Sequence, residues 1–551
     1  MNIKTLKLLL PFVFFLLISC NSDHSTNNNR VVIGISADVQ TFNSLFAFSY
    51  EETMIADLLY PGLLDFRWND ESGELDVYPM IATKWEWSDD SSSIKFILRD
   101  DVKWSDGEKL TAEDIVFSYD LYSDPDVQSR LMGTFDQFFL EKDGHIDIQK
   151  TFQINSEYEL NIFFPPDSNP DLIKMVVPVI PKHIFENVQK DELGTHQSSF
   201  DPVSSGAFKL KNWERNQTIK LEADSSSLQF QQGQIPEIVF KIVPDYTSRL
   251  LQLKKGDIDL LELIKVEDFQ ELVAIENLSV NNIAGREYDY IGWNNINVDQ
   301  ARKGISEPNK LFGSRNIRKA LTAAINRKEI LEEYLLNQGL LAATPVSPIF
   351  KAAFNDEINP YEYNPEEAKR LLMAEGWKDE NKNGILEKGK TEFKFTLHYP
   401  VGNPLRDYAA VIIKNNLKAV GVEVTTEKME LGAFIDNLYE KKIDAWLAGF
   451  GVPIPLELKP YWYSDPNVGF LNFSSYHNPE TDKILDLLET KISKEKKYEL
   501  IKEFQEIIHQ DEPVTFLYWT PNIVVYNKKI ENLKITPYGV LVHCWEWRLE
   551  N

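Results

Sequence analysis

One stretch of this 551-residue chain carries the letters of a phosphate-binding loop. In residues 383–393, NGILEKGKTEF, the residues Gly384, Gly389, Lys390 and Thr391 fall at the spacing of a nucleotide-binding P-loop. Such a loop needs a buried strand before it and a helix N-terminus after it, because backbone N–H groups cradle the phosphates. Here polar WKDENKN precedes the loop, and EFKFTLHY, which alternates as a strand does, follows it. The flanking residues therefore predict a hairpin turn instead of a nucleotide site.

The same stretch also resembles a calcium-binding loop. Asp379, Asn381, Asn383 and Gly384 occupy the first, third, fifth and sixth positions of the EF-hand pattern. The twelfth position requires a bidentate carboxylate but holds Lys390, whose ammonium group repels the ion. The eight histidines include no pair at metal-binding spacing and no HExxH motif. We therefore expect neither a metal nor a cofactor.

Signals for enzymatic chemistry are weak in this sequence. There is no GxSxG motif, and Cys544 stands beside Trp545 in an apolar segment, which favours a buried thiol over a nucleophile. A carboxylate pair could serve a secreted hydrolase, but among 85 Asp and Glu residues the existence of a pair carries no information. The formal net charge of −27 repels DNA, RNA and acidic lipid surfaces. We predict a protein that is not an enzyme and binds no nucleic acid, with the hydrolase as the alternative.

The first twenty residues predict export. A basic start, an apolar segment at residues 8–18 and the sequence LISC are typical of a signal peptide, and the apolar segment is too short to span a bilayer. LISC resembles the lipobox of bacterial lipoproteins. We predict a signal peptide at residues 1–19, lipid attachment at Cys20, and a tether over residues 20–30. The mature protein would be anchored to a bacterial membrane, in the periplasm or at the cell surface.

An alternating pattern of predicted strands and helices appears twice along the chain. The first block begins near residue 236 and contains a helix that starts at Asp245 and stops at Gly256. The second covers residues 392–449 as strand, helix, strand, helix and strand with short links. Short alternating runs at residues 145–165 predict antiparallel hairpins. Two α/β blocks and a hairpin-rich insert predict two lobes, and a cleft between lobes is where small ligands bind.

Two further helices carry explicit signals at their ends. Thr111 is placed to cap one helix, while Asn364 and Pro365 start another that Gly376 can end. In an open parallel sheet, the carboxyl ends of the strands border the ligand cleft. The loop GFGVPIP, after a strand predicted at residues 443–449, is therefore a candidate ligand loop.

Several segments occur in an order that is typical of one protein family. They are YPGLLDF, MIATKWEWSDDSSSIKFILRDDVKWSDGEKLTAEDIVFSYDL, SSGAFKL, RLLQLKKGDIDLLE, SRNIRKALTAAINRKEIL and NNLKAVGVEVTTEKMELGAFIDNLYEKKIDAWLAGF. Together they resemble the family 5 extracellular solute-binding proteins, the dipeptide, oligopeptide and nickel binders of ABC importers. The resemblance implies an α/β, bilobal, periplasmic-binding-protein type II-like fold of three domains with a hinge between the lobes. It also implies capture of a ligand and its delivery to a membrane permease.

The resemblance and the alternating pattern together predict how the chain is divided. The main domain of lobe I takes residues 31–53, 201–285 and 523–551, its inserted domain takes residues 54–200, and lobe II takes residues 286–522. The expected partners are a peptide or other small solute, the permease subunits, and the membrane through the lipid anchor. We expect a monomer. A sensor or binding module that serves no transporter is a further alternative.

The resemblance also nominates ligand-binding residues. SADVQTF resembles the first ligand-lining loop of the family, and SSGAFKL resembles its glycine turn. Aromatic residues near GFGVPIP offer stacking surfaces, although aromatic side chains are also the ordinary content of large cores. The candidates are Asp38, Gln40, Gly206, Trp446, Gly449, Phe450, Gly451 and Trp462.

One departure from the family concerns the charged anchors of the ligand. In oligopeptide binders the loop resembles GWxxDxxxP, and its Asp pairs with the free amino group of the peptide, but here Pro453 falls where that Asp would stand. Two arginine positions of that branch hold Leu438 and Leu447, while Glu457 or Asp38 could replace the missing acid. An ammonium group buried without a partner forfeits several kcal/mol. We therefore predict that free short dipeptides bind poorly and that blocked or longer peptides, or a non-peptide solute, bind better.

Overall fold

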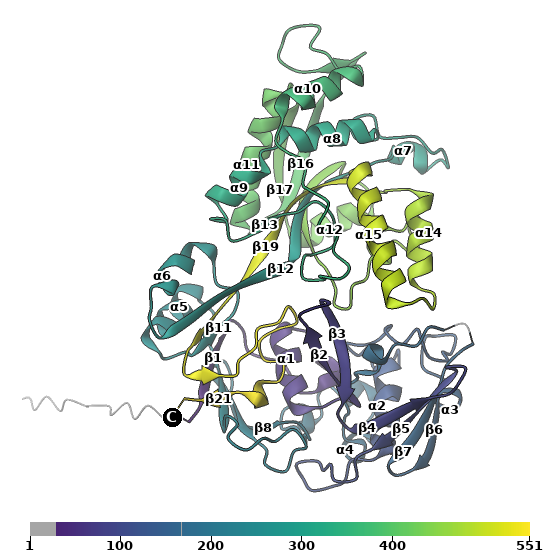
Figure 1. Cartoon of the computed structure of the whole chain (residues 1–551), viewed down its shortest axis with the longest axis vertical. Coiled ribbons are helices and arrows are strands. Elements are labelled where there is room, and N and C mark those ends of the chain that lie inside the picture. The colour runs from purple at the N-terminus through teal and green to yellow at the C-terminus, as the bar shows by residue number, and fades with distance from the viewer. Residues whose placement is uncertain (1–28, 167, 551) are drawn as a thin grey trace, which may run out of the picture.

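The computed structural model describes residues 29–166 and 168–550, which form two lobes, one above the other in Figure 1. The predicted signal peptide, Cys20 and nearly all of the predicted tether lie outside these ranges. Within them, no helix has both the length and the apolar character needed to cross a membrane.

One sheet of eleven strands runs through both lobes. Its strands are β1 (Val31–Ile35), β8 (Phe208–Glu214), β9 (Thr218–Ala223), β10 (Glu237–Ile242), β11 (Leu260–Leu261), β12 (Leu278–Trp293), β13 (Leu340–Leu341), β16 (Lys394–Pro400), β17 (Glu423–Met429), β18 (Ala445–Gly451) and β19 (Val514–Asn527). The order is β17-β16-β18-β12-β19-β11-β1-β10-β9-β8, and β13 pairs with β19 outside this path. Strands β17, β16 and β18 belong to lobe II. Strands β11, β1, β10, β9 and β8 belong to lobe I.

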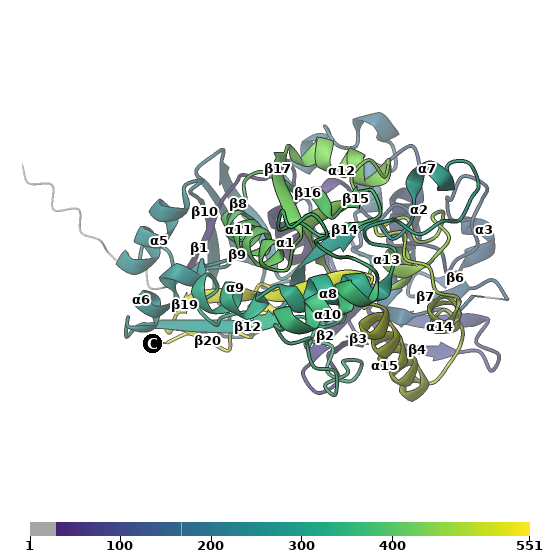
Figure 2. The same cartoon turned by 90° about the horizontal axis from the view of Figure 1, so that it is seen from above.

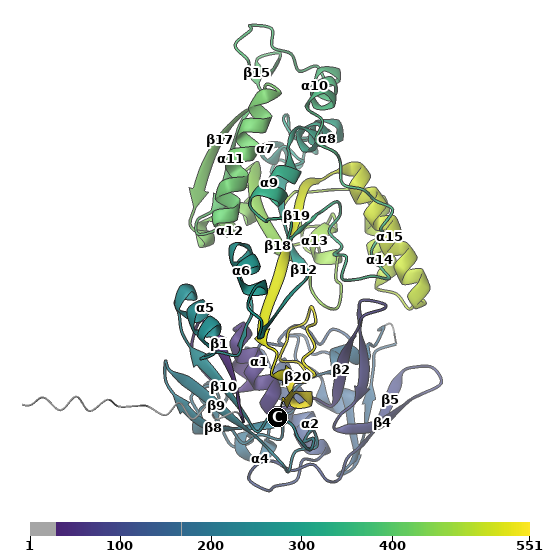
Figure 3. The same ribbon diagram turned by 60° about the vertical axis from the view of Figure 1, so that its left-hand side comes forward.

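Strands β12 and β19 are long and cross from one lobe to the other (Figure 3). They pair in antiparallel fashion, but the register breaks between Ala284, opposite Pro521, and Tyr288, opposite Trp519. Three residues of β12, from Gly285 to Glu287, therefore lie opposite a single residue of β19, Thr520. Such a bulge bends the strand and increases its twist. The predicted domain boundaries after residues 285 and 522 fall at or beside this bulge, and we propose that the lobes hinge there.

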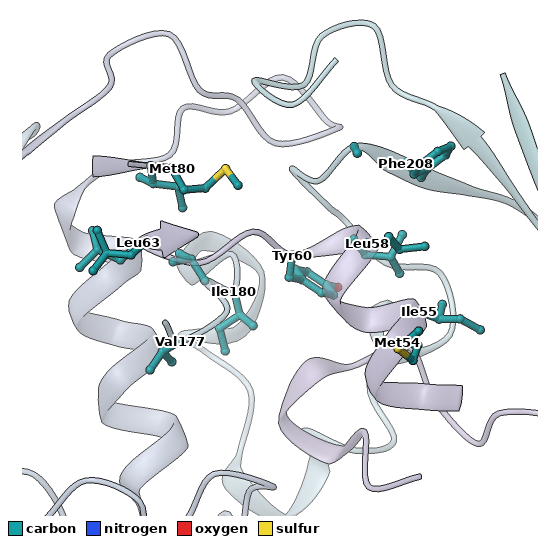
Figure 4. Packing of buried hydrophobic residues seen from close by; sticks show 14 of the residues in the cluster. Met54, Ile55, Leu58, Tyr60, Leu63, Met80, Val177, Ile180 and Phe208 are labelled. Atoms are coloured by element: carbon teal, nitrogen blue, oxygen red, sulfur yellow. The ribbon is translucent and has the colours of Figure 1, made fainter. Parts of the chain in front are cut away.

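In lobe I, β1 runs parallel to β10 and β11, since its Ile33 pairs with Phe240 and with Leu260, while β9 and β8 continue the sheet in antiparallel fashion. Its helices include α1 (Tyr50–Leu59), α5 (Tyr246–Lys255) and α6 (Phe269–Val273). Helix α1 begins with a capping box, in which Ser49 and Glu52 satisfy each other's backbone N–H groups. It buries Met54, Ile55 and Leu58 in the core of the lobe, with Phe208 of β8 close by (Figure 4).

The inserted part of lobe I is rich in hairpins. It holds the pair β2 (Leu64–Asn69) and β3 (Glu74–Pro79), the strands β4 (Ala82–Trp87), β5 (Ser93–Leu98), β6 (Phe152–Ser156) and β7 (Glu159–Phe163), and the helices α2 (Ala112–Ser123), α3 (Ile148–Thr151) and α4 (Lys182–Phe185). Strands β4 to β7 form one antiparallel sheet in the order β4-β5-β7-β6, and β2 and β3 form a separate pair. The hairpin predicted at residues 145–165 is confirmed as the pair β6 and β7.

Lobe II confirms the predicted alternating pattern of strands and helices at residues 392–449. Strands β16, β17 and β18 are parallel and are connected by α11 (Pro404–Ala419) and α12 (Leu431–Tyr439). The remaining helices are α7 (Val298–Ala301), α8 (Arg315–Ala324), α9 (Arg327–Glu333), α10 (Pro365–Ala374), α13 (Lys459–Trp462), α14 (Pro479–Leu488) and α15 (Lys494–Asp511). Figure 2 looks down on this lobe, where α8 packs against α10.

Both faces of the lobe II sheet are covered. Leu447 and Trp293 belong to the apolar core on one face, whereas Trp446 and Tyr290 belong to the core on the other. Successive side chains of a strand point to opposite faces, so the continuous apolar run AWLAGF is what a strand covered on both faces requires.

The predicted helix ends are confirmed. Thr111, Asp245 and Asn364 each accept a hydrogen bond from a backbone N–H group in the first turn of the helix that follows. Gly256 ends α5 with a φ of 81°, and Gly376 follows α10 with a φ of 91°, a left-handed conformation that glycine adopts without a steric penalty.

Residues 383–393 form a hairpin, as predicted. Strands β14 (Glu387–Lys388) and β15 (Thr391–Glu392) pair with each other, and β16 follows directly where a P-loop requires a helix. The Asp379 carboxylate accepts hydrogen bonds from the backbone N–H groups of Asn383 and Gly384. This acid therefore stabilises the turn.

Candidate ligand-binding cleft

The carboxyl ends of the parallel strands of both lobes border the gap between the lobes, which is where ligands bind in open α/β sheets. On lobe I, the ends of β1 and β11 meet the start of α1 around a cavity of about 90 Å³. Residues that line this cavity include Ser36, Tyr50, Glu51, Glu262 and Leu263. The same lining includes Arg249 and apolar side chains, namely Ile33, Ile35, Met54, Phe240 and Leu541, so the first candidate surface combines polar groups with apolar side chains.

Hydrogen bonds link the polar groups of this lobe I surface. The Tyr50 hydroxyl donates to the two carboxylate oxygens of Glu262 at 3.1 Å each, and the Ser36 hydroxyl donates to Glu51 at 3.2 Å. Desolvation of the half-buried Glu262 raises the pKa of its carboxyl to about 7, and the charge of Glu51 adds to the rise. Near neutral pH, Glu51 and Glu262 together therefore carry less than the two negative charges of fully ionised carboxylates.

Lobe II contributes an aromatic surface. The half-buried Phe450 ring lies nearly parallel to Tyr290, with 5.2 Å between centroids and an angle of 11°, and nearly parallel to Phe473 at 6.1 Å and 12°. Tyr461 meets Phe450 edge to face at 5.1 Å. A small hollow beside these rings is lined by residues that include Tyr288, Gly451, Pro453 and Glu457. This surface suits aromatic stacking and apolar contact.

Phe450 and Gly451 reach this surface from a strand and not from a loop. The strand predicted at residues 443–449 lies two residues later, as β18, because Phe450 pairs with Tyr288 and Gly451 with Glu287 of β12. The predicted end of the strand was therefore wrong by two residues. These two residues belong to the strand because they pair with β12, which lies more than 150 residues earlier in the chain. The loop begins at Val452.

Asp38, Gln40 and Gly206 lie on lobe I and line none of the cavities described above. The Asp38 carboxylate accepts hydrogen bonds from the indole N–H of Trp213 at 3.0 Å and from the backbone N–H groups of Val39 and Asn216 at 2.9 and 2.7 Å. Gly206 is buried, and a Cβ atom there would stand 2.2 Å from the carbonyl oxygen of Leu58. Gln40 is exposed, and its backbone N–H donates to Glu52. These contacts hold the lobe I framework in place.

The two tryptophan candidates are buried in the core of lobe II. Trp446 is 1% exposed, its indole N–H donates to the Tyr290 hydroxyl, and Gly292 leaves the space for its ring. Trp462 is 4% exposed and packs against Phe504 and Phe516. Trp446 lines none of the cavities described above, whereas Trp462, although mostly buried, lines the hollow beside Phe450 and Tyr461. Leu438 and Leu447 are core residues as well.

Gly449 makes room for a buried ion pair. The Arg406 guanidinium at the start of α11 contacts Asp289 of β12 at 2.7 Å, and their side chains are 19% and 4% exposed. A Cβ atom at Gly449 would stand 2.4 Å from the Asp289 carboxylate and 2.6 Å from the guanidinium. The absence of a side chain at this position therefore preserves the pair.

Replacing Gly449 with alanine is expected to lower the free energy of unfolding by about 1–3 kcal/mol, because the new methyl group must displace a hydrogen-bonded pair. Gly451 on the same strand is the matched control. A Cβ atom there meets the Glu287 side chain at an ordinary 3.7 Å. Gly451→Ala should change stability by less than about 0.5 kcal/mol. Urea denaturation followed by tryptophan fluorescence measures both values, and equal losses would contradict this role for Gly449.

Glu457 lies on the loop that follows β18, beside Phe450 and Tyr461. Its side chain is exposed, and partial desolvation nevertheless raises the pKa of its carboxyl. Of the two acids proposed to replace the missing Asp, Glu457 reaches the aromatic surface, whereas the Asp38 carboxylate already accepts three hydrogen bonds.

The lobes also touch at a second place, where the tip of the β2–β3 hairpin meets lobe II (Figure 1). The Tyr498 hydroxyl of α15 donates to Glu74 at 2.6 Å, and the backbone N–H of Ala352 donates to the carbonyl of Ser72 at 2.8 Å. A cavity of about 130 Å³ lies between the hairpin and α15. Any motion of one lobe against the other must therefore preserve or rearrange these contacts.

Sequence reasoning missed most of the residues that line the cleft. Tyr50 and Glu51 begin the helix that Ser49 caps, and Glu262 directly follows the last residue of β11. A search for polar side chains next to the carboxyl ends of predicted parallel strands could have found these residues. Within the described ranges, no three His, Cys, Asp or Glu side chains lie close enough together to hold a metal ion.

Comparison with known proteins gives a consistent result. The sequence model of the bacterial extracellular solute-binding proteins, family 5 Middle, matches residues 76–469. The oligopeptide-binding protein AppA of Bacillus subtilis (strain 168) is 29% identical, with 99% of each chain covered. Heme-binding protein A of Haemophilus influenzae is 24% identical over 94% of this chain and 91% of that protein.

A solved structure shares the fold. The Bacillus subtilis AppA structure, determined in complex with a nonapeptide, matches with a TM-score of 0.71 and 27% identity, over 95% of this chain and 99% of that one. The bilobal α/β, periplasmic-binding-protein type II-like fold predicted from the sequence is thus confirmed. Since the family model covers well over half of the chain, this protein belongs to the family 5 bacterial extracellular solute-binding proteins.

Proposed function

We propose that this protein captures a peptide or peptide-like solute between its two lobes and delivers it to the permease of an ABC importer. It acts as a monomer, held at a bacterial membrane by a lipid on Cys20. The names of the relatives support a peptide, since one binds oligopeptides and its solved structure holds a nonapeptide. A heme binder among the relatives shows that family members take other solutes too.

The observation that carries this proposal is the pair of unlike surfaces that face the gap. Tyr50 and Glu262 present polar groups from lobe I, while Phe450 and Tyr461 present aromatic rings from lobe II. A peptide offers both backbone polar groups and apolar side chains, so it can satisfy both surfaces at once. The bulge in β12 gives the two strands that join the lobes a place to bend.

Small-angle scattering with and without a pooled peptide mixture tests the capture. Binding should reduce the radius of gyration, because hinge closure brings the lobes together. Incubation of the same mixture with the purified protein, followed by mass spectrometry, should leave the peptides intact. Cleavage at a rate proportional to protein concentration would favour the secreted hydrolase.

Delivery is tested separately from capture. Cells that lack this protein should lose uptake of the bound peptides, and normal uptake in their presence would favour a sensor or binding module that serves no transporter. Size-exclusion chromatography with light scattering should give the mass of one chain.

A further inference from the structure

The bulge in β12 fixes the position of one arginine, Arg286. It is the middle one of the three residues that lie opposite Thr520. Gly285 packs so tightly that a Cβ atom would stand 1.9 Å from the carbonyl oxygen of Thr520, and the Thr520 hydroxyl donates to the carbonyl of Glu287 at 3.2 Å. The backbone on both sides of Arg286 is therefore held. Bulges next to binding sites often serve to re-aim a side chain.

The Arg286 side chain is exposed and lies next to Val452 on lobe II. Its Nη1 donates to the carbonyl oxygen of Val452 at 3.0 Å, while the backbone N–H of Val452 donates to the carbonyl of Arg286 at 2.9 Å. Val452 lines the hollow beside Phe450 and Tyr461. The guanidinium is thus tied to the edge of the aromatic surface, at the hinge between the lobes.

Tyrosines of both lobes lie within the electrostatic reach of Arg286. Burial raises the pKa of Tyr50 and Tyr538 on lobe I and of Tyr461 on lobe II, and in each case the positive charge of Arg286 opposes the rise. Its charge therefore acts across the gap, on both surfaces that a ligand would contact.

Arg286 differs from Arg406, which lies at the start of α11. Arg406 is neutralised by Asp289, whereas the ion pairs formed by the described residues do not include Arg286. A guanidinium carries five N–H donors, and the bond to Val452 uses one of its nitrogens. When the lobes close, water leaves the cleft, and a cation without an anionic partner becomes unfavourable there.

We propose that Arg286 binds a carboxylate of the ligand and so selects solutes that bring a free acid to the hinge. This inference rests on the proposed capture of peptides and names the group that the cleft recognises. The planar guanidinium matches a carboxylate with two parallel N–H···O bonds, which gives orientation as well as affinity. The acid is either the C-terminal carboxylate of a peptide or an acidic side chain.

Three pools of N-acetylated peptides, four to nine residues long, distinguish these sources. One pool has free C-terminal acids and no Asp or Glu, the second has the same sequences as C-terminal amides, and the third adds one Asp to each amide. Equilibrium dialysis against the full mature protein, read by mass spectrometry, gives the retention of each pool. The acid pool should be retained at least about tenfold better than the plain amides, because hydrogen bonds to charged groups are the strong ones. A preference confined to the third pool would assign the site to acidic side chains instead.

Arg286→Gln should remove this preference, so that the variant retains the acid pool no better than the plain amides. Arg302→Gln is the matched control, because the Arg302 guanidinium also donates to a backbone carbonyl, that of Glu440, but lies on lobe II outside the cleft residues. Equal thermal melting of the three proteins establishes that the variants fold. If the wild-type protein retains all three pools alike, or if Arg286→Gln keeps the acid preference, the role of Arg286 is refuted while peptide capture stands. Retention of no pool would refute both.

Discussion

A dipeptide with a free amino group is expected to bind about 100-fold more weakly than the same dipeptide carrying an N-acetyl group. The closed cleft strips water from the ammonium group, and an unpaired charge costs several kcal/mol, of which about 2.7 kcal/mol corresponds to 100-fold in affinity. Pro453 occupies the position at which the resemblance to oligopeptide binders predicts an Asp for the amino group of the peptide. The Asp38 carboxylate already accepts hydrogen bonds from Trp213 and from two backbone N–H groups. Calorimetry with matched free and acetylated dipeptides measures the ratio.

The opposite result would identify a different partner for the amine. If free dipeptides bind tightly and acetylation abolishes binding, Glu457 is the acid that reaches the aromatic surface, and Glu457→Gln should then reproduce the loss. Glu503→Gln, at an exposed position on α15, is the control for a general change in charge. Tight binding that survives Glu457→Gln would exclude both explanations.

Cys20→Ser is expected to move nearly all of the protein from the membrane fraction to the soluble fraction. Each buried methylene group contributes about 0.8 kcal/mol to membrane binding, and two acyl chains hold a protein where a single chain holds it only marginally. Ligand binding should be unaffected, since the predicted attachment site is at the start of the predicted tether, ahead of β1 in the sequence. Fractionation of cells and labelling with a radioactive fatty acid measure the two parts of this prediction.

Cys544→Ala is the matched control for that experiment. Cys544 is fully buried, and burial raises the pKa of its thiol well above the usual range, so it should take no label in either protein. The Cys544→Ala protein should stay at the membrane and keep its label. A Cys20→Ser protein that still sediments with membranes would contradict the lipid anchor.

Local signals predicted much of the fold. The strands and helices between residues 392 and 449 follow from periodicity, and the caps at Thr111, Asp245 and Asn364 follow from residue types that satisfy free N–H groups. The turn at residues 383–393 followed from its flanks, even though two motifs suggested other chemistry. Such features depend on neighbours within a few residues.

The candidate site depended on distant neighbours and was harder to predict. The run AWLAGF shows that both faces of β18 are buried, but not that Trp446 turns toward Tyr290 and away from the cleft. The role of Gly449 requires Asp289 and Arg406, which come from other elements. Nothing in the local sequence marks the bulge that positions Arg286, because it arises from the register between two strands.

The place of β19 in the sheet constrains how the chain can fold after export. β19 lies between β12 and β11, yet it is the last long strand to be made, and its Tyr518 meets Asp289 across 229 residues of chain. Until it arrives, β11 and β12 each expose an unpaired edge, which invites pairing with other chains. Contacts so distant in sequence form slowly. For export through a signal peptide, as predicted here, we expect the polypeptide to stay unfolded, or to be shielded by a chaperone, until its C-terminal segment has crossed the membrane.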